Sequence, residues 1–264
     1  MQMKLSKHNS EIQKGARNFK GRFLRYAIFC AICILPAYLW GVVSGYKHLF
    51  PTRQLFLLQN RLVSSGSLLS GTYLMHYVAQ TKPRNTLFEA IQTQSDIVMI
   101  GDSLTQDGLW SEMFPAVKIA NRGIGGDRTI DVLNRMGPIL ATKSKKAFIL
   151  LGLNDFAYGV SVDQVFSNYI KIVQALQKNG MTVYIQSTLE CSRATCGTQD
   201  DMVKALNLKL QAYAKVNKIV FIDLNKVFAP KNTGLLSKYT YDGSHLNGGG
   251  YAQWGALISP FIRQ

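Results

Sequence analysis

The sequence predicts an α/β domain built on a parallel, doubly wound, flavodoxin-like sheet of about five strands, preceded by a transmembrane helix. Short runs rich in β-branched residues recur from about residue 96, and longer helical stretches separate them. Strands of this kind are buried on both faces, which requires helices on both sides of the sheet. An uncharged apolar run upstream of the strands supports the membrane helix.

Residues 1–25 form a basic tail. They hold seven Lys and Arg residues against Glu11, and residues 1–94 hold twelve against Glu11 and Glu89, so most of the formal charge of +15 precedes the predicted domain. The chain has no zinc-finger spacing and no basic–aromatic RNA motif, which argues against nucleic acid as a partner. A basic segment beside an apolar run is more simply a topology signal.

Residues 26–45 are predicted to be a transmembrane anchor. Tyr26 to Val43 carry no charge, and this length is near the lower limit of roughly 17–25 residues for a spanning helix. The positive-inside rule then leaves the N-terminus in the cytoplasm and the following domain in the periplasm or outside the cell. A cleaved secretory signal is the alternative, although the preceding segment is long and no A-x-A site follows. A buried soluble helix would need a polar face, which the run lacks.

Residues 46–94 are interpreted as a juxtamembrane helical stalk, or as helices that pack on the domain. Their apolar residues are patchy, and Gly66 and Gly71 weaken a single continuous helix. The Lys-Pro-Arg-Asn stretch at 82–85 predicts a break. No catalytic chemistry is evident in this segment.

The predicted domain covers residues 95–264. The expected strands are 96–101, 117–121, 147–153, 182–189 and 219–224, and the expected helices lie near 103–113, 127–137, 162–178, 199–216 and 248–263. Folds of this class place their sites at the carboxyl ends of the strands. We therefore expect the residues that follow these strands to gather at one edge of the sheet.

Two motifs follow the first two strands. Ser103 lies in Gly-Asp-Ser-Leu at a strand-to-helix turn, where backbone N–H groups favour developing negative charge, although a serine there is also an ordinary helix cap. Residues 120–127 contain three glycines, including Gly126, that permit a tight turn. Their spacing fits neither a dinucleotide fingerprint nor a P-loop, so the loop suits an anion-binding turn or a purely structural one.

Two further motifs follow the third strand and precede the last helix. Asn154, in Gly-Leu-Asn-Asp, carries an amide that can donate to an oxyanion, although Asn and Asp also initiate turns. Asp242 precedes His245 by three residues, a spacing that lets a carboxylate hold one imidazole nitrogen while the other faces a nucleophile. Asp102 and Asp155 are assigned supporting roles. Arg128 is expected to be solvated, or else to meet an anionic substrate.

The four cysteines fall into two sequence pairs. Cys30 and Cys33 lie inside the apolar run without further metal ligands nearby, so we interpret them as packing residues. Cys191 and Cys196 flank a short polar stretch, and outside the cytoplasm they are predicted to form a disulfide. Two free thiols are the alternative.

Taken jointly, the four motifs resemble those of the SGNH hydrolases, also called GDSL esterases and lipases, over residues 95–264. Within that resemblance, Ser103 matches the nucleophile, Gly126 the oxyanion glycine, Asn154 the oxyanion amide, and Asp242 with His245 the D-x-x-H motif. The Asn-Arg-Gly-Ile-Gly-Gly-Asp stretch is similar to the acetylhydrolase and carbohydrate-esterase branch. Residues 1–94 lie outside the resemblance.

The resemblance implies a serine esterase that needs no metal and no cofactor. His245 would take the Ser103 proton, Asp242 would orient the imidazole, and Ser103, Gly126 and Asn154 would bind the oxyanion. The leading hypothesis is hydrolysis of small acyl esters, O-acetyl groups first, on an envelope or extracellular glycan. The alternatives are a lipase, phospholipase or thioesterase, an O-acetyltransferase, and a non-catalytic, membrane-tethered glycan-binding protein.

Overall fold

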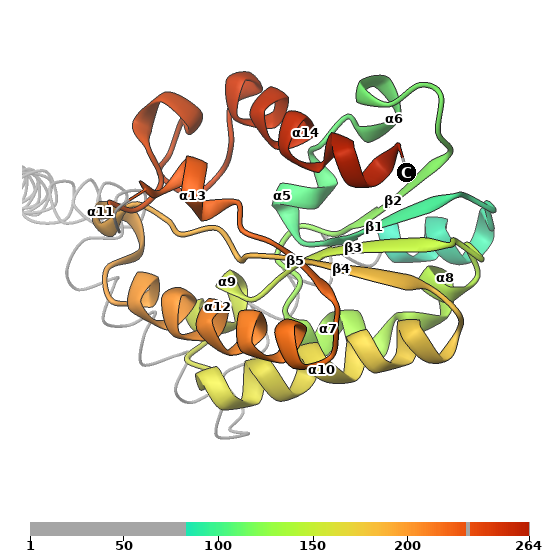
Figure 1. Cartoon of the computed structure of the whole chain (residues 1–264), viewed down its shortest axis with the longest axis horizontal. Helices are drawn as coiled ribbons and strands as arrows, with labels where there is room; N and C mark the ends of the chain where they lie inside the picture. The colour runs from blue at the N-terminus through green and yellow to red at the C-terminus, as the bar shows by residue number, and fades with distance from the viewer. Residues whose placement is uncertain (1–82, 231–232, 264) are drawn as a thin grey trace, which may run out of the picture. The chain divides into compact units, whose positions relative to one another are not determined.

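In the computed structural model, which describes residues 83–230 and 233–263, five parallel strands form one sheet in the order β2-β1-β3-β4-β5 (Figure 1). The strands are β1 (Ile97–Gly101), β2 (Ile119–Gly123), β3 (Lys146–Leu150), β4 (Thr182–Gln186) and β5 (Val220–Ile222). This order is the flavodoxin-like one, with its switch point between β1 and β3. The predicted α/β class and five-stranded parallel sheet are confirmed.

Helices cover both faces of this sheet. Residues of α7 (Thr129–Asn134), α8 (Met136–Leu140), α10 (Val162–Lys178) and α12 (Gln199–Val216) belong to one apolar core cluster. Residues of α5 (Ser103–Gln106), α6 (Trp110–Met113), α13 (Asn225–Phe228) and α14 (Gly248–Ile262) belong to the other. The shorter elements are α9 (Leu153–Ala157), α11 (Arg193–Cys196) and a 3-10 turn, η4 (Ser237–Tyr239).

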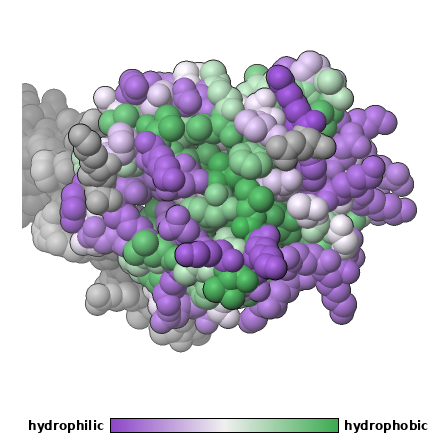
Figure 2. Space-filling view, in the orientation of Figure 1, coloured by the Kyte–Doolittle hydropathy of each residue, from purple (hydrophilic) through white to green (hydrophobic). Residues whose placement is uncertain are grey.

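The central strands bury both of their faces. Along β1, Val98 and Ile100 enter the first core cluster, whereas Ile97 and Met99 enter the second. The four side chains are 0–1% exposed, which explains why β1 is an unbroken apolar run rather than an alternating one. At the edge of the sheet β5 is less covered, and Figure 2 shows hydrophobic residues across the centre of the face where β5 lies.

Two of the expected helices are each divided into two. The helix expected near 103–113 becomes α5 and α6 because the Asn121 amide on β2 binds the carbonyls of Thr105, Gln106 and Gly108, at 3.0, 3.0 and 3.2 Å. Carbonyls at the end of a helix lack partners within it, so the Asn121 amide stabilises the end of α5 at this point. The helix expected near 127–137 becomes α7 and α8, with Pro138 in the first turn of α8, where the missing N–H costs little.

Residues 83–90 are helical, so the break predicted at 82–85 is wrong over its described part. This helix contacts the domain: the Arg84 Nε donates to the Gly123 carbonyl at 2.8 Å, and the Arg122 guanidinium lies 4.5 Å from the Phe88 ring centre. The tail at 1–25, the anchor at 26–45 and the stalk up to residue 82 lie outside the described residues. Among the helices that are described, none combines the length and apolarity of a membrane span.

Candidate active site

Ser103 is the first residue of α5 and follows β1 after a single residue. That intervening residue, Asp102, caps the helix: the Leu104 N–H donates to its Oδ1 at 3.0 Å. Asp102 is 2% exposed, and burial raises its pKa to about 7, against the lowering effects of the Leu104 hydrogen bond and of His245. The strand-to-helix turn therefore holds the Ser103 backbone in one place.

Ser103, His245 and Asp242 form one hydrogen-bonded chain. The Ser103 Oγ lies 3.0 Å from the His245 Nε2, and the His245 Nδ1 lies 2.7 Å from the Asp242 Oδ2. Serine and histidine are 142 residues apart in the sequence, so the fold itself brings them together. A hydroxyl, an imidazole and a carboxylate in this order can pass a proton from the hydroxyl to the ring and stabilise the ring's charge.

The histidine is presented by the loop between η4 and α14. Asn247 caps α14, since its Oδ1 accepts from the Gly250 N–H at 3.0 Å. One turn into the helix, the Tyr251 hydroxyl donates to the Leu104 carbonyl of α5 at 2.9 Å. These contacts join the start of α14 to the start of α5, which sets the His245 ring beside Ser103.

The Asp242 carboxylate is fixed by its own loop as well as by the imidazole. Its Oδ1 accepts from the backbone N–H groups of Ser244 and His245 at 2.8 and 2.7 Å. Burial pushes the pKa of Asp242 upward, but the hydrogen bonds from His245 and Ser244 outweigh it and lower the pKa below its usual value. Asp242 is therefore ionised wherever an imidazolium needs a counter-charge.

The glycine loop after β2 lies against Ser103. A Cβ placed on Gly125 would be 3.7 Å from the Ser103 Cβ, and the Gly125 N–H donates to the Gln106 side chain of α5 at 2.9 Å. Gly126 has a φ of +81°, a backbone conformation that residues with a Cβ atom rarely adopt. The structure thus brings Gly125, the neighbour of the predicted oxyanion glycine Gly126, to the serine turn.

Asn154 lies in α9, which follows β3, and its side chain contacts the Ser103 turn and the glycine loop. Its Nδ2 donates to the Asp127 carbonyl at 3.1 Å and to the Asp102 Oδ2 at 3.3 Å. The amide therefore connects the residue after Gly126 with the residue before Ser103. The next residue, Asp155, is 1% exposed and accepts from the Thr129 N–H and hydroxyl at 2.9 and 2.6 Å, which ties α9 to the start of α7.

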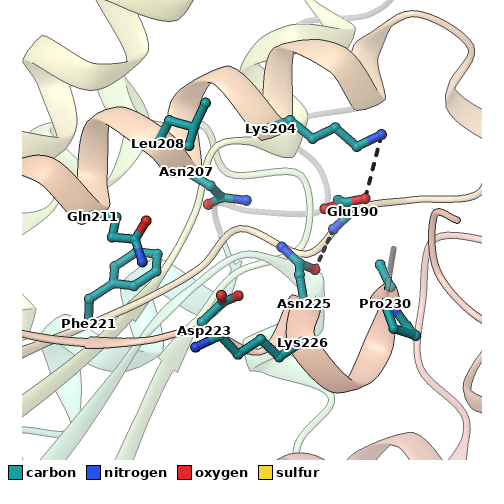
Figure 3. Close-up of a pocket in the computed structure, with 11 residues that line it drawn as sticks. Glu190, Lys204, Asn207, Leu208, Gln211, Phe221, Asp223, Asn225, Lys226 and Pro230 are labelled. Carbon is teal, nitrogen blue, oxygen red and sulfur yellow. Dashed lines mark hydrogen bonds and ion pairs between the residues drawn. The ribbon is translucent and has the colours of Figure 1, made fainter. Parts of the chain in front are cut away.

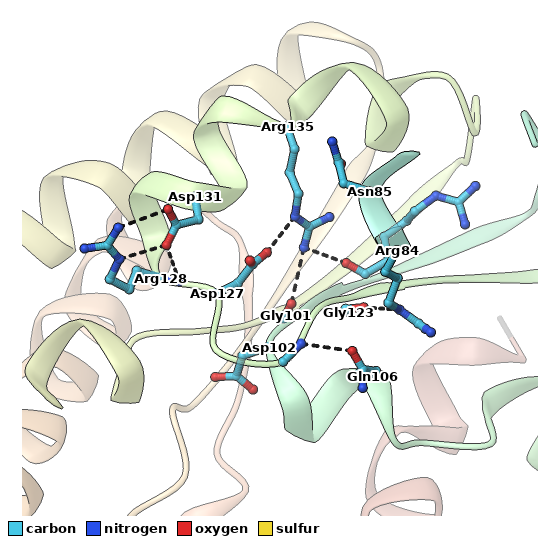
Figure 4. A network of polar contacts seen from close by, with 12 residues as sticks. Arg84, Asn85, Gly101, Asp102, Gln106, Gly123, Asp127, Arg128, Asp131 and Arg135 are labelled. Atoms are coloured by element: carbon cyan, nitrogen blue, oxygen red, sulfur yellow. Dashed lines mark hydrogen bonds and ion pairs between the residues drawn. The ribbon is translucent and has the colours of Figure 1, made fainter. Parts of the chain in front are cut away.

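A buried arginine holds the end of the glycine loop. The Arg135 Nε donates to the Asp127 Oδ2 at 2.6 Å, and its Nη2 donates to the Arg122 carbonyl at 2.8 Å (Figure 4). At the start of the loop, Arg84 binds the Gly123 carbonyl. Arg128 is not simply solvated as expected: it pairs with Asp131 at 2.8 Å, and its side chain is 26% exposed.

The predicted pair Cys191 and Cys196 is joined by a disulfide in the structure. For metals, the described residues offer no group of three or more His, Cys, Asp or Glu side chains placed to hold an ion. The pair Cys30 and Cys33 lies outside the described residues.

A separate pocket of about 530 Å³ lies between α12 and the segment from β5 to α13 (Figure 3). Neither Ser103, His245 nor Asp242 lines it. Its wall holds Glu190, whose Oε2 is 3.7 Å from the Lys204 Nζ. Burial, and then the nearby Asp200, raise the pKa of Glu190 to about 7. The residues that line this pocket include no Ser, Thr, Cys or His side chain, so the candidate active site is the Ser103 edge of the sheet.

Three residues that support the site were not predicted: Asn121, Arg135 and Tyr251. Each binds a backbone carbonyl or a charged group that lies between 8 and 147 residues away in the sequence. Asn121 was visible inside the glycine motif, but only the pairing of β1 with β2 reveals its partner in α5.

Comparison with known proteins finds one family whose model spans all four motifs. The family model of the GDSL-like Lipase/Acylhydrolase proteins matches residues 99–253. Platelet-activating factor acetylhydrolase IB subunit alpha2 of Rattus norvegicus is 25% identical over 171 residues, covering 61% of this chain and 72% of that protein. The crystal structure of a GDSL-like lipase from Bacteroides thetaiotaomicron is 26% identical with a TM-score of 0.62, covering 69% of this chain and 96% of that one.

A third match is partial. N-acylneuraminate cytidylyltransferase of Streptococcus agalactiae is 28% identical over 126 residues, which is 47% of this chain. The chain spans about 30% of the length of that relative.

Proposed function

Because the chain belongs to the GDSL-like Lipase/Acylhydrolase family, we propose that it hydrolyses small acyl esters, O-acetyl esters first, through an acyl-serine intermediate on Ser103. Ester hydrolysis, Ser103 as the nucleophile and acetyl as the preferred acyl group are all parts of this proposal. One observation carries it: the Ser103 Oγ lies 3.0 Å from His245 Nε2, while the other ring nitrogen lies 2.7 Å from the Asp242 carboxylate.

The reaction follows from the positions of these groups. The Ser103 oxygen attacks the ester carbonyl as its proton passes to His245 Nε2, and the imidazolium is stabilised by Asp242. The imidazolium then protonates the departing alcohol, which leaves the acyl group on Ser103. A water molecule then gives a proton to His245 Nε2 and its oxygen attacks the acyl carbonyl. As the bond from the acyl carbon to the Ser103 oxygen breaks, His245 returns that proton to the Ser103 oxygen and the acid leaves, so both residues return to their first state.

The oxyanion formed in each step needs hydrogen-bond donors that are already in place. We assign this role to the backbone N–H groups of Ser103 and Gly126 and to the Asn154 amide. In the free protein, the longer of the two Asn154 contacts is the one to Asp102, at 3.3 Å. A substrate oxygen replaces that contact, and the contact to the Asp127 carbonyl keeps the amide oriented.

The preference for acetyl is supported by the named activity of one relative, the acetylhydrolase, of which this chain covers 72%. The cytidylyltransferase gives no support for a cytidylyltransferase activity in this chain, because the match covers only 30% of that protein. A glycan as the alcohol part of the ester rests on the predicted export of the domain. We propose that residues 26–45 anchor the chain with its domain in the periplasm or outside the cell, as the apolar run and the basic residues before it indicate.

A substrate panel tests the proposal. The full-length chain and its Ser103→Ala variant should be assayed with p-nitrophenyl esters of two to twelve carbons and with an acetylated glycan. We expect the highest kcat/KM on the two-carbon ester, release of acetate into water, and no turnover by the variant. A preference for long chains would favour a lipase, and acetate transferred to an added glycan would favour a transferase.

The membrane proposal has its own test. A tag at the C-terminus should be accessible from outside the cytoplasm, and the chain should resist extraction by alkaline carbonate. A cytoplasmic tag would overturn the topology.

A further inference from the structure

The loop that carries the proposed acid–base pair, residues 240–247, is partly exposed. The side chains of His245 and Asp242 are 35% and 37% exposed. A hydrogen-bonded pair at such a surface gains little from Coulomb attraction alone, so its geometry depends on what holds the backbone beneath it. We call residues 240–247 the acid–base loop.

A second loop forms hydrogen bonds with the backbone of the acid–base loop. The Thr195 hydroxyl donates to the Asp242 carbonyl at 2.9 Å, and the Ser192 N–H donates to the Gly243 carbonyl at 2.7 Å. The Thr195 hydroxyl has only one hydrogen. The Ser192 hydroxyl must therefore be the donor in its 2.8 Å contact with Thr195 Oγ1. The result is an ordered chain of donors that ends on the residue whose carboxylate binds His245.

The two loops fit too closely for a side chain at their contact. Gly243 has a φ of +87°, and a Cβ built on it would be 2.3 Å from the Thr195 Oγ1 and 2.4 Å from the Ser192 Oγ. Glycine is required here by both its conformation and the space available.

A disulfide fixes the second loop to the core. Ser192 and Thr195 lie between Cys191 and Cys196, which are bonded to each other. Cys191 is 0% exposed, and the N–H of the residue before it, Glu190, donates to the Asn225 Oδ1 at 3.0 Å. The sulfur bridge therefore connects the buried segment that follows β4 to the short helix α11, whose Thr195 holds Asp242. We call residues 191–196 the disulfide loop.

We propose that the disulfide loop is a positioning element for the Asp242–His245 pair, with Thr195 as its positioning residue. This rests on the proposed function, in which His245 receives the Ser103 proton. With the bridge in place, the Thr195 hydroxyl holds the Asp242 backbone so that its carboxylate meets the imidazole. Without the bridge the turn moves, and the imidazole loses its alignment with Ser103. Displacements of about 1 Å at such a site cost up to roughly 10²-fold in rate.

The test compares four forms of the full-length chain: wild type, Thr195→Val, Thr195→Ser and the double variant Cys191→Ser/Cys196→Ser. Thr195→Val keeps the shape of the side chain but removes its donor, whereas Thr195→Ser keeps the donor. The double variant removes the bridge without leaving a free thiol. Steady-state kinetics with p-nitrophenyl acetate gives kcat and KM, and amide hydrogen exchange over residues 240–247 reports the acid–base loop directly.

We expect Thr195→Val and the double variant to lower kcat by about 10-fold with KM changed less than about twofold, and to speed exchange in the acid–base loop. Thr195→Ser should retain wild-type kcat and wild-type exchange. Dithiothreitol, which gives two electrons and two protons to the sulfurs and becomes its own cyclic disulfide, should reproduce the loss in the wild type but not in the double variant.

Unchanged kcat and unchanged exchange in both Thr195→Val and the double variant would overturn the proposal. So would an equal loss in Thr195→Ser, or a loss confined to KM. If the wild type itself has no esterase activity, the proposed function fails, and the exchange data alone then decide whether the disulfide loop holds the acid–base loop. Circular dichroism of each variant separates a local effect from unfolding.

Discussion

Replacing Asp155 by asparagine should remove part of the protein's pH-dependent stability. Asp155 is 1% exposed and lies in α9, where it accepts two hydrogen bonds from Thr129 at the start of α7. Burial raises its pKa to about 6, although the hydrogen bonds from Thr129 oppose the rise. The carboxyl group therefore holds its proton more firmly in the folded chain than in the unfolded chain.

The sign and size of the effect follow from this pKa. Between the ordinary value of 3.8 and about 6, the folded state binds more protons, so the contribution is complete below pH 3.8 and is lost as the pH rises through 6. About two pH units at about 1.4 kcal/mol each give roughly 3 kcal/mol in total. About 2 kcal/mol of this falls between pH 4.5 and pH 7.5.

Urea unfolding of the full-length wild type and of Asp155→Asn at these two pH values measures the effect. From pH 4.5 to pH 7.5, the unfolding free energy of the wild type should fall by about 2 kcal/mol more than that of the variant. The amide oxygen of the variant still accepts the Thr129 N–H, so the variant should fold. Asp163→Asn is the matched control, because Asp163 is 84% exposed and its pair with Lys209 contributes little. Equal slopes for wild type and Asp155→Asn would refute the reasoning.

Three further changes test other parts of the account. Asn154→Ala should lower kcat by roughly 10²–10³-fold with little change in KM, because it removes an oxyanion donor; steady-state kinetics showing an unchanged kcat would exclude that role. Asp242→Asn should lower kcat by about 10³–10⁴-fold, since an amide cannot stabilise the charged His245 ring, and a loss under tenfold would contradict the assignment. Trp254→Phe should lower the unfolding free energy by about 1–3 kcal/mol in urea, because the indole N–H donates to Gln186 at 2.6 Å in the core; an unchanged midpoint would contradict this.

The fold was predictable because local pattern and burial agree. The strands are short apolar runs, and both faces of β1 and β3 are buried in the structure, as the interleaved helices led us to expect. Helices α10 and α12 were expected at 162–178 and 199–216, and the structure places them at those residues. Ser161, whose side chain caps α10, is the kind of local signal from which such boundaries can be read.

The divided helices depend on contacts that no local pattern contains. The end of α5 is set by Asn121, which lies on a neighbouring strand and donates to three of the carbonyls near the end of that helix. Asn154 was predicted as an amide donor directly after the third strand, without a helix there; it lies in α9, and this short helix aims its amide at Asp102 and at the Asp127 carbonyl. Such positions follow from strand pairing, which the sequence does not state.

In the site, too, residues that directly follow a strand were predictable, whereas contacts between distant loops were not. Ser103, Gly126 and Asn154 each follow a predicted strand, so their meeting at one edge of the sheet could be expected from topology. The Thr195 contact with the backbone of Asp242 could not, because it joins the short helix α11 to a loop 47 residues away. Tertiary packing of loops is therefore the part of this site that needs a structure.

The most direct test of the account is to identify the residue that a fluorophosphonate modifies in the full-length chain. Peptide mapping by mass spectrometry should find the adduct on Ser103, with loss of esterase activity in proportion to labelling. Ser103→Ala should take up no probe and should lose activity by roughly 10⁴-fold or more. A labelled residue other than Ser103, or an active Ser103→Ala variant, would contradict the central claim.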